Sequence, residues 1–361
     1  MNSLVRLAGL MTTALLVGGC AQVEYYLQAA KGQLALLSEA RPIDDWLADP
    51  EVGTKLKTRL AKAREIRRYA ARELGLPDND SYKNYADLKR PYVLWNVVAT
   101  PELSMKAERW CFPIAGCVNY RGYYNKQEAM DYATALRRTG LDVQVSGVAA
   151  YSTLGWFNDP VLSTFIQYPD GELARLVFHE LAHQVAYAKD DTQFNESFAT
   201  AVEEIGVERW MVTQANETTR QKYREFDGRK RDFLGLLIAY RGRLERNYAG
   251  SASDAEKRAE KIRTFISLQN DYQQLKITWG GYAGYDRWFA EPLSNAHLAS
   301  VATYHDYVPA FRELLTEQKS LNKFYRAVKA MAALDATTRR QQMSQLSRHA
   351  ALASISTAAP R

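Results

Sequence analysis

Residues 176–184 read LVFHELAHQ and contain two histidines four positions apart, with a glutamate directly after the first. The apolar residues around them are typical of a helix with a wide buried face. Because residues four apart lie on one helical face, His179 and His183 can both reach one zinc ion at ~2.0–2.1 Å. In this arrangement Glu180 faces a water on the metal and takes its proton. The stretch therefore predicts a zinc hydrolase, with zinc as its cofactor.

A catalytic zinc needs a third protein ligand, and two downstream glutamates compete for that role. The segment 194–199, FNESFA, resembles the third-ligand helix of the gluzincins, zinc peptidases in which the Glu of an Asn-Glu pair binds the metal. The resemblance implies that Glu196 is the ligand and that Asn195 supports it. Spacing from His183 instead favours Glu203, two turns further along the same face. We give more weight to the local motif, and expect Glu203 to accept the free N–H of a ligand histidine.

Amide hydrolysis also needs a donor for the developing charge on the substrate carbonyl oxygen. In aminopeptidase-like gluzincins a tyrosine has this role, so the resemblance implies a tyrosine downstream of the metal helices. We predict Tyr304, although each candidate in this region is equally an ordinary core or surface residue. The other candidates are Tyr282, Tyr285 and Tyr307, with His297 and His305 nearby.

The chain before the zinc helix has extended, aromatic and β-branched segments at 92–99, 117–124 and 143–150, with a helix expected at 126–139 between the last two. In zincins an edge strand beside the metal helix pairs with the peptide substrate. Residues 145–157 are the candidate for that strand, and an ordinary sheet strand is the alternative.

From Asp170, which we expect to cap the zinc helix, the chain reads as almost wholly helical, with long helices near 217–247 and 253–277. The predicted fold class is α+β: mostly helical, with a zincin-like metallopeptidase core and a small mixed sheet before the zinc helix. The expected segments are a signal peptide at 1–19, an N-terminal helical segment at 20–90, the catalytic core at 91–215, a C-terminal helical region at 216–350 and a flexible tail at 351–361.

The first 20 residues, MNSLVRLAGLMTTALLVGGC, have the form of an export signal. The run 17–20, VGGC, resembles the lipobox of bacterial lipoproteins, which implies cleavage before Cys20 and lipidation of that cysteine. Ala21 resembles the residue that directs Gram-negative lipoproteins to the outer membrane. We therefore expect a lipid anchor on the periplasmic side of that membrane. An ordinary secretory signal or an uncleaved anchor is the alternative.

Export places the other two cysteines, Cys111 and Cys117, in an oxidising compartment, which favours a disulfide that closes a tight loop. A metal pair is the alternative, but the spacing is not C-x-x-C and no second pair lies nearby.

The formal net charge is +6, and 24% of the residues are charged. Much of the Lys and Arg lies on segments that read as helices and alternates with Glu and Asp, which indicates solvated helix faces. The sequence has no phosphate loop and no RNA- or DNA-binding signature. We therefore expect a peptide substrate and a membrane contact through the lipid, and no nucleic acid partner.

Several long stretches together resemble a family of bacterial proteins described as predicted aminopeptidases, often lipoproteins. They are 110–124 (WCFPIAGCVNYRGYY), 150–165, 178–184, 194–203 and the region 295–311. The resemblance implies a zinc-dependent peptidase of the aminopeptidase class, with Glu204 or Glu208 as candidates to bind the substrate amino group. A zinc endopeptidase is the first alternative. A non-enzymatic envelope lipoprotein with a structural or vestigial metal site is the second.

Overall fold

The computed structural model describes residues 23–112, 116–299, 301 and 306–358. The first described element is a helix of residues 23–38. The remaining elements follow in the order β1 (Arg41–Pro42), α2 (Ile43–Ala48), α3 (Thr54–Arg72), β2 (Asn84–Ala86), β3 (Leu94–Pro101), β4 (Trp110–Phe112), β5 (Gly116–Val118), β6 (Arg121–Tyr123), α4 (Lys126–Arg138), β7 (Leu141–Val148), β8 (Val161–Leu162), α5 (Asp170–His183), α6 (Thr192–Gln214), α7 (Glu217–Ala249), α8 (Asp254–Thr278), η1 (Asp286–Phe289), α9 (Asn295–Ala299), α10 (Val308–Gln318), α11 (Leu321–Ala332) and α12 (Ala336–Ala358).

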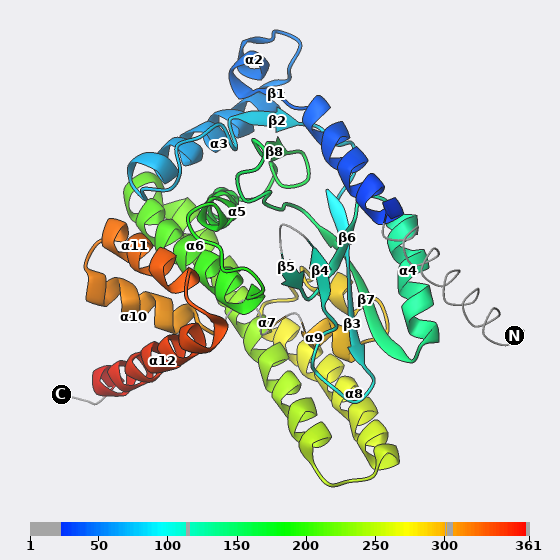
Figure 1. Cartoon of the computed structure of the whole chain (residues 1–361). Helices are drawn as coiled ribbons and strands as arrows, with labels where there is room; N and C mark the ends of the chain where they lie inside the picture. The colour runs from blue at the N-terminus through cyan, green and yellow to red at the C-terminus, as the bar shows by residue number, and fades with distance from the viewer. Residues whose placement is uncertain (1–22, 113–115, 300, 302–305, 359–361) are drawn as a thin grey trace, which may run out of the picture.

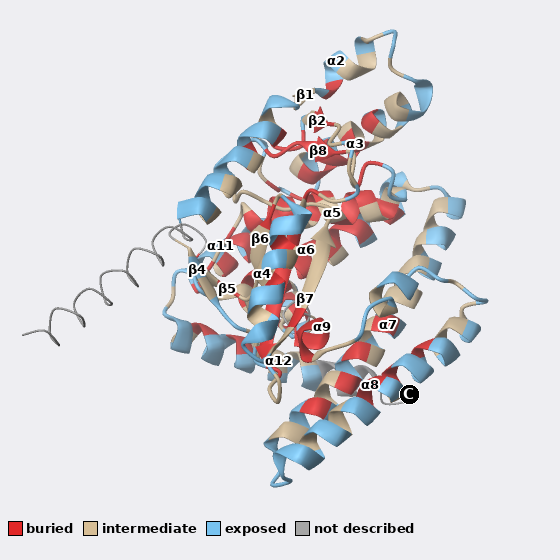
Figure 2. Cartoon of the chain, turned by 90° about the vertical axis from the view of Figure 1, so that its right-hand side faces the viewer, coloured by how far each residue is buried: buried red, intermediate tan, exposed pale blue. Residues whose placement is uncertain are grey.

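Helices α5 and α6 lie side by side at the centre of the molecule, with α3 above them and α10 and α11 beside them in Figure 1. Both are buried along most of their length (Figure 2). The main apolar core extends in sequence from Leu36 to Met343, so it joins segments from nearly the whole described chain. Strand β2 pairs with β8, and the boundary expected at 90–91 therefore separates two strands of one sheet.

The largest sheet has the strand order β6-β3-β7, and both pairings are antiparallel. Successive residues of β3 point to opposite faces, as the two-residue period of a strand requires. Trp95 and Val97 pack in the apolar cluster beneath α4, whereas Leu94 and Asn96 line a cavity on the other face. One face of the sheet therefore packs in an apolar cluster, and the other face lines the cavity of the candidate site.

The expected α+β class is confirmed, but the strands before α5 do not form one mixed sheet. The sheet β6-β3-β7 is antiparallel throughout, and the mixed one is a separate small sheet in the order β1-β2-β8. Strands β4 and β5 form a hairpin in which Cys111 lies opposite Cys117, and a disulfide joins the two. Short strands that each cover a different part of the helical core explain this division.

Side-chain caps fix several helix starts. Asn125 caps α4, Asp191 caps α6, and Ser253 with Glu256 forms a capping box at α8. The zinc-motif helix is different: its N-cap is Pro169 and no side chain caps it, so the expectation that Asp170 is the cap is wrong. Asp170 is instead the first helical residue, and its carboxylate accepts a hydrogen bond from Arg59 at 2.5 Å.

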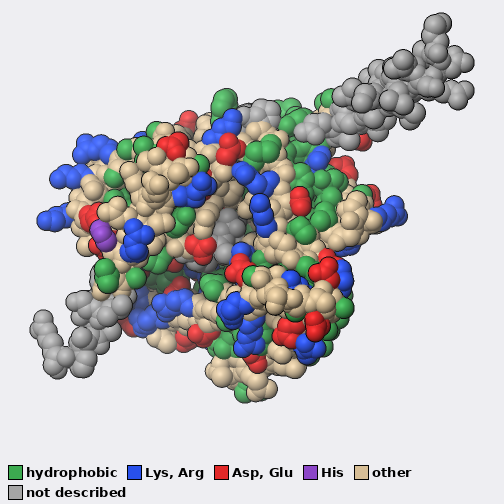
Figure 3. Space-filling view, turned by 60° about the horizontal axis from the view of Figure 1, so that its bottom comes forward, with side chains coloured by type: hydrophobic (Ala, Val, Ile, Leu, Met, Phe, Trp, Pro, Cys, Tyr) green, Lys and Arg blue, Asp and Glu red, His purple; other side chains and the backbone are tan. Residues whose placement is uncertain are grey.

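Helices α7 and α8 form an antiparallel arm that projects from the body (Figures 1 and 2). They share an apolar cluster of their own, which includes Phe233, Leu237 and Leu268. Helix α12 continues to Ala358, so the tail expected from 351 is largely helical. In the view of Figure 3, basic and acidic side chains are mixed over the surface rather than separated. No helix in the described chain is both long enough and apolar enough to span a bilayer.

Candidate metal centre

Three side chains from α5 and α6 converge on one point between the two helices. The structure brings together His179 and His183, one turn apart on α5, with Glu196 in the second turn of α6. The two Nε2 atoms are 3.2 Å apart, and Oε2 of Glu196 lies 3.3 Å from Nε2 of His179 and 3.8 Å from that of His183. The three potential ligand atoms therefore form a compact, nearly equilateral triangle.

This triangle fits a tetrahedral dication. Ligand atoms at ~2.0–2.1 Å from a tetrahedral zinc are separated by ~3.3–3.4 Å, close to the three observed distances. The donor set of two imidazole nitrogens and one carboxylate is also one that zinc accepts. In a buried site, two nitrogen lone pairs and a carboxylate that face one another repel unless a cation lies between them. His179, His183 and Glu196 are therefore suited to hold a metal ion.

A network of charged side chains contacts Nδ1 of His179, the ring nitrogen that is not part of the triad. This nitrogen lies 2.9 Å from Oε2 of Glu203, and the other oxygen of Glu203 accepts a hydrogen bond from Arg175. Lys230 of α7 adds a second cation, with Nζ 3.7 Å from the same carboxylate. Although burial opposes ionisation, Arg175 and Lys230 hold the pKa of Glu203 well below its usual range. Glu203 can therefore accept the Nδ1 proton of His179, which leaves Nε2 free to bind a metal.

Burial changes the proton affinities of the cluster. It lowers the pKa of His183 to about 4, so this ring is neutral at neutral pH. Burial also opposes the charged form of His179, but hydrogen bonds to Glu196 and Glu203 outweigh it and raise the pKa to about 10. Without a metal, a proton on His179 would thus neutralise part of the carboxylate charge. A cation is favoured at the same point for the same reason.

Glu180 lies on the same helix and lines the same cavity as the three potential ligands. It is 9% exposed, and burial raises its pKa to about 8 against the opposing effect of His179. A carboxyl group with a pKa near neutrality can both accept and donate a proton, which is what a general acid–base group requires. A bound cation would lower this value by favouring the charged form.

The cavity at the triad has a volume of about 300 Å³ and is rich in aromatic side chains. Phe112 and Val118 of the disulfide-linked hairpin β4/β5 line this cavity, and so does Val148 of the edge strand β7. The phenol rings come from residues that precede the metal helices or follow α5 closely: Tyr25, Tyr120, Tyr124, Tyr151 and Tyr187. The sequence stretches 110–124 and 150–157 contain three of these rings, but no pattern within them indicates that the rings face the triad.

Asn195 fixes the loop between the two metal helices. Its amide accepts from the N–H of Ala188 at 2.7 Å and donates to the carbonyl of Ala188 at 2.8 Å. In the same loop Asp190 accepts the N–H of Cys117, which ties the hairpin to the metal helices. Asn195 therefore acts on the backbone that sets the position of Glu196.

The remaining predicted residues either do not line the cavity or lie outside the described residues. Tyr304 and Cys20 are outside the described residues, so their roles remain predictions. Tyr285 packs in the cluster of the α7/α8 arm, and His297 stacks edge-on against Trp288. The two candidates for the substrate amino group do not line the cavity and form ion pairs with Arg312: these are Glu204 and Glu208.

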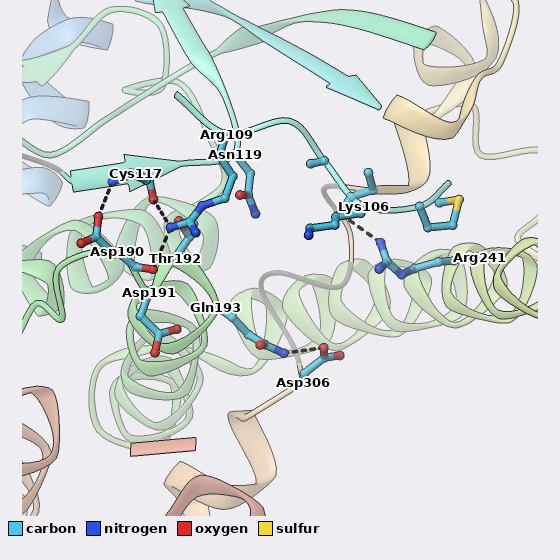
Figure 4. A pocket seen from close by; sticks show the side chains of 13 residues that line it. Lys106, Arg109, Cys117, Asn119, Asp190, Asp191, Thr192, Gln193, Arg241 and Asp306 are labelled. Carbon is cyan, nitrogen blue, oxygen red and sulfur yellow. Dashed lines mark hydrogen bonds between the residues drawn. The ribbon is translucent and has the colours of Figure 1, made fainter. Parts of the chain in front are cut away.

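A second, more polar cavity of about 320 Å³ lies against the start of α6 (Figure 4). Several of its charged and amide groups contact one another or the backbone: Gln193 donates to Asp306, Arg109 to the carbonyls of Cys117 and Asp190, and Arg241 to the carbonyls of α9. Among the residues described here, this cavity contains no group arranged for the chemistry of the triad.

The triad, Glu180 and the surrounding cavity lie within a region that matches a known family model. The match covers residues 24–343, and the family is described as "Putative aminopeptidase". Comparison with curated proteins gave no match, and neither did comparison with solved structures. Because the family model spans most of the chain, the protein belongs to this aminopeptidase family.

Proposed function

We propose that this protein is a zinc-dependent peptidase, and in particular an aminopeptidase, that hydrolyses peptide bonds in the cavity between α5, α6 and the sheet. The convergence of His179, His183 and Glu196 beside the buried carboxyl of Glu180 carries the proposal. Membership of an aminopeptidase family supports the class of substrate.

His179, His183 and Glu196 would hold the ion. When bound, zinc would supply Lewis acidity, which polarises the scissile carbonyl and makes water easier to deprotonate. Glu180 takes a proton from the attacking water and then delivers it to the nitrogen of the leaving amine. Glu203 keeps His179 in the tautomer whose Nε2 faces the triad, and the aromatic wall excludes bulk water from the reacting groups.

The test is a peptide-library digest, read by mass spectrometry, with the wild type and Glu180→Gln. Loss of the acid–base group should lower kcat by ~10²–10⁴-fold while the metal content stays the same. Glu204→Gln is the matched control, because Glu204 is a partly buried glutamate of α6 that pairs with Arg312 outside the cavity. Unchanged cleavage by Glu180→Gln would remove the mechanism. Absence of cleavage by the wild type itself would instead favour the alternative of a non-enzymatic envelope protein.

One observation favours an endopeptidase as the second candidate. Among the described residues, Glu180 and Glu196 are the two acidic side chains that line the cavity. The remaining residues of the chain contain no Asp or Glu. An aminopeptidase that holds the substrate α-amino group with a carboxylate needs a further one. Peptides with free and acetylated amino termini distinguish the two: stepwise loss of residues from free termini alone supports the aminopeptidase, and equal cleavage of both supports the endopeptidase.

We also propose that the mature protein is lipid-anchored at Cys20, on the periplasmic side of the outer membrane. The lipobox-like run 17–20 supports this. Tyr25, only five residues later, already lines the cavity, so the anchor would place the site close to the membrane surface. Palmitate labelling and membrane fractionation of the wild type and Cys20→Ala test it: label and membrane association should both be lost in the variant.

A further inference from the structure

A third cavity, of about 410 Å³, lies away from the triad, between α2, α3 and the turn that leads into β2. Its lining has five basic side chains and only two acidic ones, Asp44 and Asp78. The basic residues are Arg64, Arg67, Arg68, Arg72 and Lys83. Arg64 pairs with Asp44, and Lys83 lies 3.5 Å from Asp78 and 3.4 Å from Asp80. The remaining excess of positive charge comes from the other three arginines.

The sequence of α3 produces this excess. Arg67, Arg68 and Arg72 follow Arg64 by three, four and eight positions, so all four share one side of the helix. Arginines near a helix C-terminus also interact favourably with the helix dipole, which would explain a solvated basic face. That explanation does not account for Arg67, whose side chain is 3% exposed.

Arg67 is held rigidly, yet one of its nitrogens has no partner. Nε donates to the carbonyl of Ser81 at 2.7 Å, and Nη2 donates to the carbonyls of Pro77 and Asn79 at 2.8 Å. Nη1 is buried, and no described residue accepts from it. The closest carboxylate, that of Asp78, is 3.8 Å from Nη2 and mostly exposed. A buried donor without an acceptor is unfavourable, and more so when it is charged.

Two further donors in the same cavity are in the same condition. The hydroxyl of Tyr82, a residue that is 1% exposed, and Nε of Arg64 are buried without an acceptor among the described residues. Tyr82 also has a φ of 63°, which is strained for a bulky side chain, and its N–H is fixed by the carbonyl of Asp159 at 2.6 Å. The polar cavity of Figure 4 differs, because none of the described residues that line it leaves a buried donor unpaired.

We propose that this cavity binds a phosphate group. All three unpaired groups can donate a hydrogen bond, so a partner rich in acceptors would satisfy them, and the remaining positive charge of the lining favours an anion. Phosphate offers three or four acceptor oxygens, and the planar guanidinium of arginine matches them in pairs. The volume accommodates the phosphate together with part of the molecule that carries it. The carrier is either a small soluble phosphate ester or the headgroup of a phospholipid.

Isothermal titration of the full-length protein with inorganic phosphate tests the proposal, with sodium chloride of equal ionic strength as reference. We expect saturable binding of one phosphate per chain. The double variant Arg64→Gln/Arg68→Gln should bind at least about ten-fold more weakly, because it removes two positive charges from the lining. Arg64 is partly exposed and Arg68 is exposed, so the protein should stay folded. Tyr82→Phe keeps the ring and should weaken binding by a smaller factor. Lys55→Gln, an exposed position on the same helix, is the matched control and should change nothing.

Two results would overturn the proposal: no binding beyond the chloride reference, or equal binding by the wild type and the double variant. A second titration, with monomeric dihexanoyl phosphatidylglycerol, identifies the carrier. Binding of this lipid at least ten-fold tighter than phosphate indicates a headgroup. Equal or weaker binding indicates a soluble phosphate ester. The circular dichroism spectrum and Tm of each variant verify that it is folded.

Discussion

Charged side chains lie in different environments in the helix pair α5/α6 and in the arm α7/α8. In α5/α6, charged residues such as Arg175, Glu180 and Glu203 are buried, and burial opposes ionisation of each of them. On the arm, Glu217 and Glu256 are on the surface, where nearby donors lower their pKa values. Buried charge is unfavourable unless it is paired, so its presence in α5/α6 indicates a functional site, whereas the charges on the arm solvate two long helices.

The largest effect should come from the third ligand. Glu196→Gln keeps the size of the side chain but removes the charge that offsets a dication, so activity should fall to background. Glu204→Gln, on the same helix, should retain wild-type activity. Initial rates on the best library substrate decide this, and full activity in Glu196→Gln would show that another residue completes the triad.

The comparison also predicts that the arm contributes to stability rather than to chemistry. Leu268 of α8 is fully buried against α7, so Leu268→Ala should lower the free energy of unfolding by ~2–5 kcal/mol. Its kcat at 25 °C should not change. Ile266→Ala, at an exposed position of the same helix, should stay within ~0.5 kcal/mol of wild type. Urea denaturation gives the stabilities, and a parallel loss of kcat would mean that the arm takes part in catalysis.

Near the site, a buried acid should make stability depend on pH. Asp159 is 3% exposed, and burial raises its pKa from 3.8 to about 6. The folded state therefore keeps a proton that the unfolded chain has released, so this contribution is present below pH ~4 and is lost as the pH rises through ~6. The loss amounts to about 3 kcal/mol. Asp159→Asn cannot ionise, so its stability relative to wild type should rise by this amount between pH 4 and pH 7. Equal pH profiles for the two proteins would mean that Asp159 is already ionised in the folded state at pH 4.

The smallest effect tests one of the two ion pairs that join α5/α6 to the arm among the described residues. The other links Arg175 to Asp227 at 3.7 Å. Lys230 of α7 lies 3.7 Å from Glu203 and is 29% exposed, so solvent screens part of the interaction. Lys230→Met should weaken zinc binding by a factor of ten or less, and competition with a chromogenic chelator measures this. Arg231→Met, the exposed neighbour, should have no effect. A loss larger than a hundred-fold would give the arm a direct role in holding the metal.

The same contrast explains what the sequence can predict. The period of α5 and the motif 178–184 fix which residues share a face, so His179, Glu180 and His183 can be placed from the sequence alone. The choice between Glu196 and Glu203 is harder, because both lie on one face of α6. Contacts across the two helices distinguish their positions: Glu196 lies near Nε2 of both histidines, whereas Glu203 lies beside Nδ1 of His179.

The tyrosines of the cavity and the basic cavity could not be predicted. Tyr120 and Tyr151 reach the triad because the hairpin and the sheet fold back over α5, a contact between segments far apart in sequence. The arginines of α3 have the pattern of a solvated face, and only the turn at 77–83 buries one of them. Local patterns carry no information about such contacts.

The most direct test of the central claim is the zinc content of the purified protein, measured by inductively coupled plasma mass spectrometry after dialysis. Wild type and Glu180→Gln should each hold one zinc per chain, because Glu180 is not a ligand. His183→Ala and Glu196→Gln should hold none above background. A wild type without zinc after incubation with the ion, or a His183→Ala variant that keeps a full equivalent, would contradict the proposed metal centre.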